Sequence, residues 1–232
     1  MSNCNRLVHI ENRAFHNSKL TTLNLWNCTA LRNIGIGTFK FSVIDQLDLS
    51  HCTALETISH DAFEFSPLTT LNLLNCNRLS HIASDAFAWS RLTSLDLTDC
   101  TALVEIGNRA FSNSELTTLN LSNCTALERI GESAFENAIL TELNLSNCTA
   151  LRVIGASVFR CSLLTALDLS NCTALENIQY GAFFYSPIHL LDLRFEERTF
   201  PLRVGGICFA ASPVAELRLL DDDALAPGLY GV

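Results

Sequence analysis

Apolar residues recur along this chain with a period of 24 residues. With a cysteine at position 0 of each unit, position 3 is leucine, position 6 isoleucine and position 11 phenylalanine in eight consecutive units. Positions 16, 19 and 21 are leucine apart from Ile44 and Ile188. A period of this size predicts a solenoid of stacked units. The position-0 residues are Cys4, Cys28, Cys52, Cys76, Cys100, Cys124, Cys148 and Cys172.

A ninth unit is degenerate, and the chain ends in a polar tail. The columns continue through Val204, Phe209, Ser212, Val214, Leu217 and Leu219 if two residues are inserted near 195–200. We therefore expect one solenoid over 1–220, with 196–220 as its degenerate last repeat. Residues 221–232 fit no column and are expected to form a C-terminal cap or tail, which shields the last core layer of a solenoid.

Each unit predicts a strand followed by a compact turn. In Leu116–Leu121, Leu119 and Leu121 alternate with polar residues, as in a strand with one buried face. Strands separated by one 24-residue unit must run parallel. The segment Ile130–Phe135 is too short for an independent helix, so we expect it to form a 3₁₀ or single α turn.

Composition and charge exclude two classes of partner. The 232 residues are 48% hydrophobic and only 17% charged, with a net charge of −9. Lysines and arginines form no stripe, so neither a nucleic acid nor an anionic membrane surface is an expected partner. The start of the chain is too polar for a signal peptide, and no apolar run is long enough to span a membrane.

The repeated pattern resembles a known family. Leu-x-x-Leu-x-Leu-x-x-Cys-x-x-Leu is similar to the leucine-rich-repeat consensus, and Ile-Gly-x-x-Ala-Phe, as in residues 130–135, resembles the BspA-type subclass. The resemblance implies an α/β fold: a right-handed solenoid of about nine repeats with a parallel concave β-sheet and short 3₁₀ or α turns on its convex side. It also implies a binder used in adhesion or in host or partner recognition rather than a catalyst.

The cysteine column allows three interpretations. Neighbouring cysteines in a parallel stack lie about 4.8 Å apart with parallel side chains, whereas a disulfide needs converging Cβ atoms about 3.8 Å apart. A straight column also cannot surround a metal ion tetrahedrally. The favoured interpretation is a buried thiol that donates a weak hydrogen bond to a backbone carbonyl after the strand.

The thiols and the N-glycosylation sequons provide evidence on the cellular compartment of the protein. Ten thiols suit a cytoplasmic or other reducing compartment if the chain is complete. Glycans on sequons near the predicted strands would crowd that face, which disfavours a eukaryotic secretory route but not bacterial export. A fragment of a longer protein would instead suit the cell surface or bacterial secretion. The sequons begin at Asn27, Asn120, Asn123, Asn144, Asn147 and Asn171.

Positions 17, 18, 20 and 22 are predicted to face outward on the concave side. They are mostly threonine, asparagine and aspartate, which could form hydrogen-bonded columns that support the sheet. The alternative is a mildly acidic groove for a basic or hydroxyl-rich partner. Trp26 could be a binding hot spot or could cover the end of the core. The candidate binding residues are Trp26, Asp48, Leu74, Asp96, Glu142, Asp168, Asp192, Arg194 and Arg218.

Position 13 holds a second candidate surface. Phe41, Phe65 and Trp89 occupy it in successive units, with Tyr185 later. Exposed and contiguous aromatic residues suggest an interaction patch. Alternatively, these rings fold over the edge of the phenylalanine column. Cys161 lies in the same position and is expected to be exposed.

Recognisable catalytic chemistry is missing from the sequence. We find no nucleophile elbow, phosphate loop or metal-binding histidine pair, and we expect no catalytic, metal or cofactor residues. Asp168 and Asp192 should lie about 5 Å apart on adjacent strands, but any repeated aspartate produces such a pair. A binding module for a protein or peptide is therefore favoured. The alternative is a structural element that self-associates through an uncapped first unit.

Overall fold

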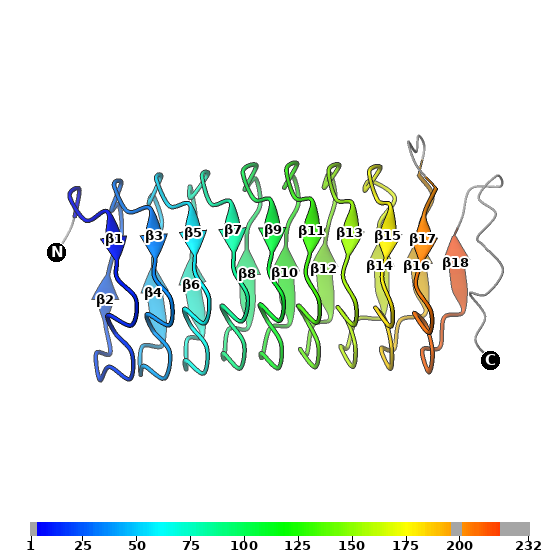
Figure 1. Cartoon of the computed structure of the whole chain (residues 1–232), viewed down its shortest axis with the longest axis horizontal. Coiled ribbons are helices and arrows are strands. Elements are labelled where there is room, and N and C mark those ends of the chain that lie inside the picture. Colours follow the sequence, from blue (N-terminus) through cyan, green and yellow to red (C-terminus); the bar gives the residue numbers. More distant parts are fainter. Residues whose placement is uncertain (1–3, 196–200, 219–232) are drawn as a thin grey trace.

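A computed structural model describes residues 4–195 and 201–218 of the chain. The molecule is a single row of stacked turns, with the odd-numbered strands in front and the even-numbered strands behind in Figure 1. Equivalent residues pair across one repeat, for example Leu119 with Leu95 and Leu143. The solenoid of about nine units is therefore confirmed for the described residues, and the predicted tail at 221–232 lies outside them.

Odd-numbered strands form one nine-stranded parallel sheet, in which neighbours are consecutive odd strands. Each is two residues long and ends at the position-6 isoleucine or its counterpart, whose side chain points into the core. These strands are β1 His9–Ile10, β3 Asn33–Ile34, β5 Thr57–Ile58, β7 His81–Ile82, β9 Glu105–Ile106, β11 Arg129–Ile130, β13 Val153–Ile154, β15 Asn177–Ile178 and β17 Arg203–Val204.

Even-numbered strands carry the predicted alternation of buried leucine and outward polar residues. They form three separate three-stranded parallel sheets, β2-β4-β6, β8-β10-β12 and β14-β16-β18. We call the surface that they present the even-strand face; it is the side predicted to be concave. The strands are β2 Leu23–Asn24, β4 Gln46–Asp48, β6 Thr70–Asn72, β8 Ser94–Asp96, β10 Thr118–Asn120, β12 Glu142–Asn144, β14 Ala166–Asp168, β16 Leu190–Asp192 and β18 Glu216–Arg218.

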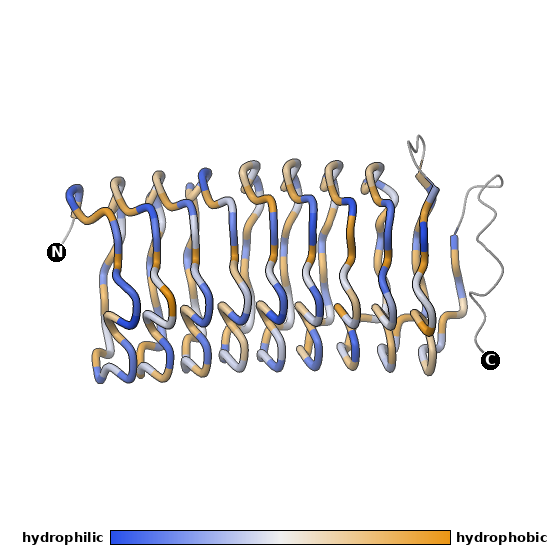
Figure 2. The backbone as a smooth tube through the Cα atoms, viewed as in Figure 1, coloured by the Kyte–Doolittle hydropathy of each residue, from blue (hydrophilic) through white to orange (hydrophobic). Residues whose placement is uncertain are grey.

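Stacked columns of apolar side chains fill the space between the two sets of strands. The position-11 phenylalanines form a continuous stack from Phe15 to Phe209, with ring centroids 5.0–5.7 Å apart. Figure 2 shows apolar and polar positions recurring at the same height from turn to turn. Each unit thus completes its core only by contact with its neighbours.

The described residues contain no helix, so the 3₁₀ or α turns expected after the odd strands are not confirmed. Successive β-turns occur instead, each closed by an amide that bonds a carbonyl three residues earlier, as in Ala86 to Ala83 and Ser90 to Phe87. Residues of positive φ, such as Asp85 and Trp89, interrupt any helical run. Other amides of the segment bond the next unit, as Phe87 does with Ala110.

Candidate functional site

The asparagine or aspartate at position 20 has a local structural role. Its side-chain oxygen accepts a hydrogen bond from the backbone amide two residues later, as Asn120 does from Ser122 (3.1 Å) and Asp168 does from Ser170 (2.8 Å). The same bond recurs from Asn24 to Asp192. At position 20 these bonds stay within one unit and form local turns. Because asparagine makes the bond equally well, the turn does not require a carboxylate charge. Side-chain bonds between units occur at position 17, where Thr117 Oγ1 donates to the Thr93 carbonyl at 2.8 Å and Thr141 Oγ1 donates to the Thr117 carbonyl at 3.2 Å.

Charge on the even-strand face is one-sided. In the units up to Ser170, positions 17, 18, 20 and 22 hold no lysine or arginine. Glu142 forms no ion pair within the described part of the chain. The acidic residues at these positions are Asp45, Asp48, Asp96, Glu142 and Asp168.

Cations appear only at the C-terminal end of this face. Arg194 Nη2 lies 2.5 Å from Asp192 Oδ2, and Arg218 Nη1 lies 3.6 Å from the same oxygen. The hydrogen bonds from Arg194 lower the pKa of the Asp192 carboxyl. The charge of Asp192 is therefore neutralised by Arg194 and Arg218 of the same chain. Asp168, its predicted partner in an acidic pair, stays on the acidic side of the face.

Strand pairing breaks at two junctions of the even-strand face. No strand pair joins β6 to β8 or β12 to β14 among the described residues, and the intervals between these strands are visibly wider in Figure 1. Leu143 of β12 is only partly buried, whereas Leu119 of the neighbouring β10 is 2% exposed. The second junction thus opens the apolar layer beneath the strands.

Two hollows accompany these junctions. One is lined by β8, β10 and β12 together with Thr165 and Ala166, so it crosses the β12/β14 junction; Asp96 and Glu142 belong to its lining. The other lies at the end of β6 and β8, where Leu74, which is 61% exposed, shares a lining with Asp96 and Asp99. A further hollow lies over β2, β4 and β6, with Asp45 and Asp48 in its lining. The structure therefore places Asp48, Leu74, Asp96 and Glu142 at hollows, and the linings of these three hollows do not include Trp26.

Trp26 lies beyond β2 and is 39% exposed. Its ring meets the His51 ring edge to face, with centroids 6.2 Å apart. This contact is with the following unit. Its use as a binding hot spot stays a prediction.

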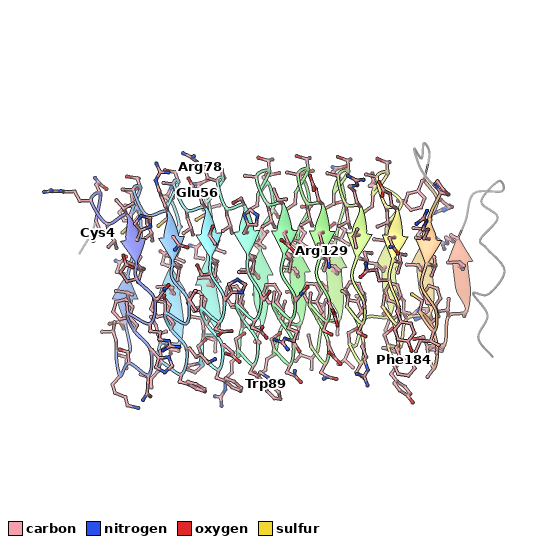
Figure 3. All side chains as sticks on the ribbon, in the orientation of Figure 1. Cys4, Glu56, Arg78, Trp89, Arg129 and Phe184 are labelled. Atoms are coloured by element: carbon pink, nitrogen blue, oxygen red, sulfur yellow. The ribbon has the colours of Figure 1, made fainter. Side chains whose placement is uncertain are left out.

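Position 13 forms an exposed aromatic edge, which we define as Phe41, Phe65 and Trp89. These side chains are 45%, 42% and 53% exposed. Their rings stack in succession, with centroids 5.1 and 5.7 Å apart, and Trp89 lies on the lower edge in Figure 3. The rings therefore face solvent instead of folding over the phenylalanine column. Tyr185, 58% exposed, is a separate aromatic residue further along.

All three residues of the aromatic edge have positive φ, between 53° and 57°. A bulky side chain is strained in this region of backbone space, whereas asparagine tolerates it. Asn113 and Asn137 occupy the position in the next units, where one amide bonds the other at 3.2 Å. Aromatic residues here thus combine backbone strain with apolar exposure, a combination that is typical of functional surfaces.

The cysteine column consists of free thiols, which are buried except for the partly buried Cys4. Thiols donate to leucine carbonyls 27 residues earlier in the chain, as Cys52 does to Leu25 (3.2 Å) and Cys76 does to Leu49 (3.2 Å), which confirms the favoured interpretation. Desolvation raises the pKa of Cys76 to about 12 and that of Cys148 to about 11. Cys161 is exposed, as expected. The described residues offer no cluster of histidine, cysteine or acidic side chains suited to a metal ion.

Two features could not be found from the sequence. The nine-stranded sheet escaped prediction because its two-residue strands are too short to show an alternation of buried and exposed positions. The breaks in the even-strand sheets have no counterpart in the leucine column, which is uniform at Leu71, Leu95, Leu143 and Leu167. Within the described ranges, no helix is long and apolar enough to cross a bilayer.

Repeating apolar columns, paired short strands and a solvent-facing strand surface define a leucine-rich-repeat solenoid. The chain belongs to the BspA type leucine rich repeat region family, whose model matches residues 2–81 and 80–212 and accounts for six copies. This family is built on a repeat scaffold. No curated protein matches the chain.

Three solved structures that the chain matches come from bacteria. A leucine-rich repeat protein from Bacteroides ovatus shares 16% identity over 88% of this chain and 68% of its own, with a TM-score of 0.42. The pneumococcal vaccine antigen PcpA shares 20% identity over 84% of this chain and 66% of its own, with a TM-score of 0.43. A leucine rich cell surface protein from Faecalibacterium prausnitzii shares 18% identity over 75% of this chain and 83% of its own, with a TM-score of 0.18.

Proposed function

We propose that this chain is a non-catalytic module that recognises a protein or peptide through its even-strand face. The observation that carries the proposal is the outward row of threonine, asparagine and acidic side chains, which takes no part in the core. Strands beneath it are held in place by stacking, so the surface exists before any partner arrives. Such preorganisation lowers the entropic cost of binding, and solenoids use extended surfaces of this kind for recognition.

Partner capture with matched variants tests this proposal. The chain is immobilised and incubated with material from its source, and each captured protein is compared between the wild type and variants. Asp48→Asn with Asp96→Asn, and Trp26→Ala, alter the even-strand face; circular dichroism checks that each variant folds. Loss of a captured partner with either variant supports the proposal. Retention of every partner by both variants would remove the even-strand face from it.

The aromatic edge is a second candidate surface for the same function. Its support is the solvent exposure of three stacked rings in a backbone conformation that favours asparagine. Phe65→Asn with Trp89→Asn introduces the residue that neighbouring units carry. A partner lost with this variant but retained by the even-strand variants binds the edge instead.

We also propose a reducing compartment or a bacterial export route for the chain. Support comes from the ten free thiols, most of them buried in one column. Thiol titration on protein isolated from its source tests this: ten reduced thiols after unfolding are the expected result, and oxidised thiols within the column would contradict it.

A further inference from the structure

We propose that the partner presents an extended cationic segment, with lysine or arginine side chains alternating with small residues, and that this segment lies across β8–β14 in the hollow that contains Asp96 and Glu142. This inference rests on the proposed function and names the chemistry of its partner.

The first step is the charge of the surface. Up to Ser170, the outward positions of the even-strand face carry five carboxylates and no lysine or arginine. At position 20, asparagine and aspartate make the same turn, so the charge of Asp96 has no role in folding that asparagine could not fill. A face of one sign attracts a partner of the other sign and repels acidic competitors.

The second step is the shape of the surface. The hollow follows three paired strands and then crosses the junction where β12 and β14 do not pair. Leu143 is partly exposed there. A segment lying across the strands therefore meets carboxylates and a small apolar contact in one continuous depression.

The third step is spacing. Glu142 pairs in register with Thr118, and Thr118 pairs with Ser94, two residues before Asp96. Two strand intervals and two residues along a strand separate the carboxylates by roughly 12 Å. In an extended segment, residues four apart are about 13 Å apart. Two cationic side chains at that spacing can each reach one carboxylate.

Binding of an eight-residue peptide of alternating lysine and threonine, measured by calorimetry at low salt, tests the inference. The Asp96→Asn, Glu142→Thr variant places residues of neighbouring repeats at both positions and should weaken binding about tenfold. The control variant, Glu128→Ser with Glu132→Asn, removes the same charge from exposed positions outside the hollow and should change binding less than twofold. Added salt should weaken binding to the wild type.

Three results would overturn the inference: equal losses in the test and control variants, equal binding of a glutamate–threonine peptide, or no binding of the lysine peptide to the wild type. Each leaves the proposed function standing if the captured partner still depends on the even-strand face. Capture of the partner that is unaffected by the even-strand variants would instead contradict the proposed function, whether or not the lysine peptide binds.

Discussion

Phe63 and Phe65 lie two residues apart in one turn, yet only Phe63 belongs to the core. Phe63 is fully buried between Phe39 and Phe87, at centroid distances of 5.0 and 5.1 Å. Phe65 is 42% exposed and has a φ of 53°. Burial, and not residue type, therefore decides what each ring contributes to stability.

We predict that Phe63→Ala lowers the free energy of unfolding by about 3–5 kcal/mol, because it leaves a cavity in the column. Phe65→Asn should change it by less than about 1 kcal/mol, since relief of backbone strain offsets the lost ring stacking. Urea unfolding of the two variants measures both effects. Similar losses in the two variants would show that the aromatic edge is part of the core.

The buried thiols predict a loss of stability in alkaline solution. Burial raises the pKa of Cys52 and Cys100 to about 11, from 9.0. The unfolded chain loses these protons first as the pH rises, so it is favoured above pH 9; the contribution is fully present below pH 9 and declines towards about pH 11. Urea midpoints at pH 8 and pH 10 measure the decline.

Cys100→Ala should reduce the dependence of the urea midpoint on pH, because one thiol with a raised pKa is removed. An identical dependence in the Cys100 variant would contradict this role of the thiol column.

At the scale of elements, the leucine column is regular but the strand pairing is not. The Leu97 amide bonds the Asn120 carbonyl and the Leu121 amide bonds the Asn144 carbonyl, both at 2.9 Å. The equivalent amides of Leu73 and Leu145, at the two junctions, form no such bond in the described structure. The even strands thus form three small sheets, whereas the odd strands form one sheet of nine strands.

Hydrogen exchange should reveal these junctions. We predict that the Leu73 and Leu145 amides exchange faster than those of Leu97 and Leu121, because protection follows backbone hydrogen bonding. Residue-resolved exchange measured by NMR provides the comparison. Uniform protection of all four amides would mean that the even strands form one unbroken sheet in solution.

Much of each element could be predicted from the sequence. A period of 24 residues places Leu119, Leu121 and Phe135 in the core, where the structure has them, and the ninth unit was found through Phe209, which stacks on Phe183. Two-residue strands could not be predicted because they are too short to show an alternation, and the junctions could not be predicted because the leucine column is unchanged across them. The candidate site was only partly predictable for the same reason: Asp96 and Glu142 were identified, but the hollow that contains them was not.

At the scale of the molecule, stability and surface both come from repetition. Contacts run between neighbouring units, and inter-unit ion pairs such as Arg32 with Glu56 (3.2 Å) and Arg109 with Asp85 (2.9 Å) lie on the outside. Figure 3 shows Glu56 and Arg78 together along the upper edge. Exposed pairs of this kind contribute at most about 1 kcal/mol each, so the stacked apolar columns hold the molecule together.

Removal of one unit tests the stacking of 24-residue units most directly. Deletion of residues 101–124 joins two equivalent positions, whereas deletion of residues 101–112 shifts every later column by half a unit. We predict that the first variant keeps a cooperative unfolding transition and its strand signal in circular dichroism, and that the second loses both. Equal behaviour of the two variants, whether both fold or both unfold, would contradict the account.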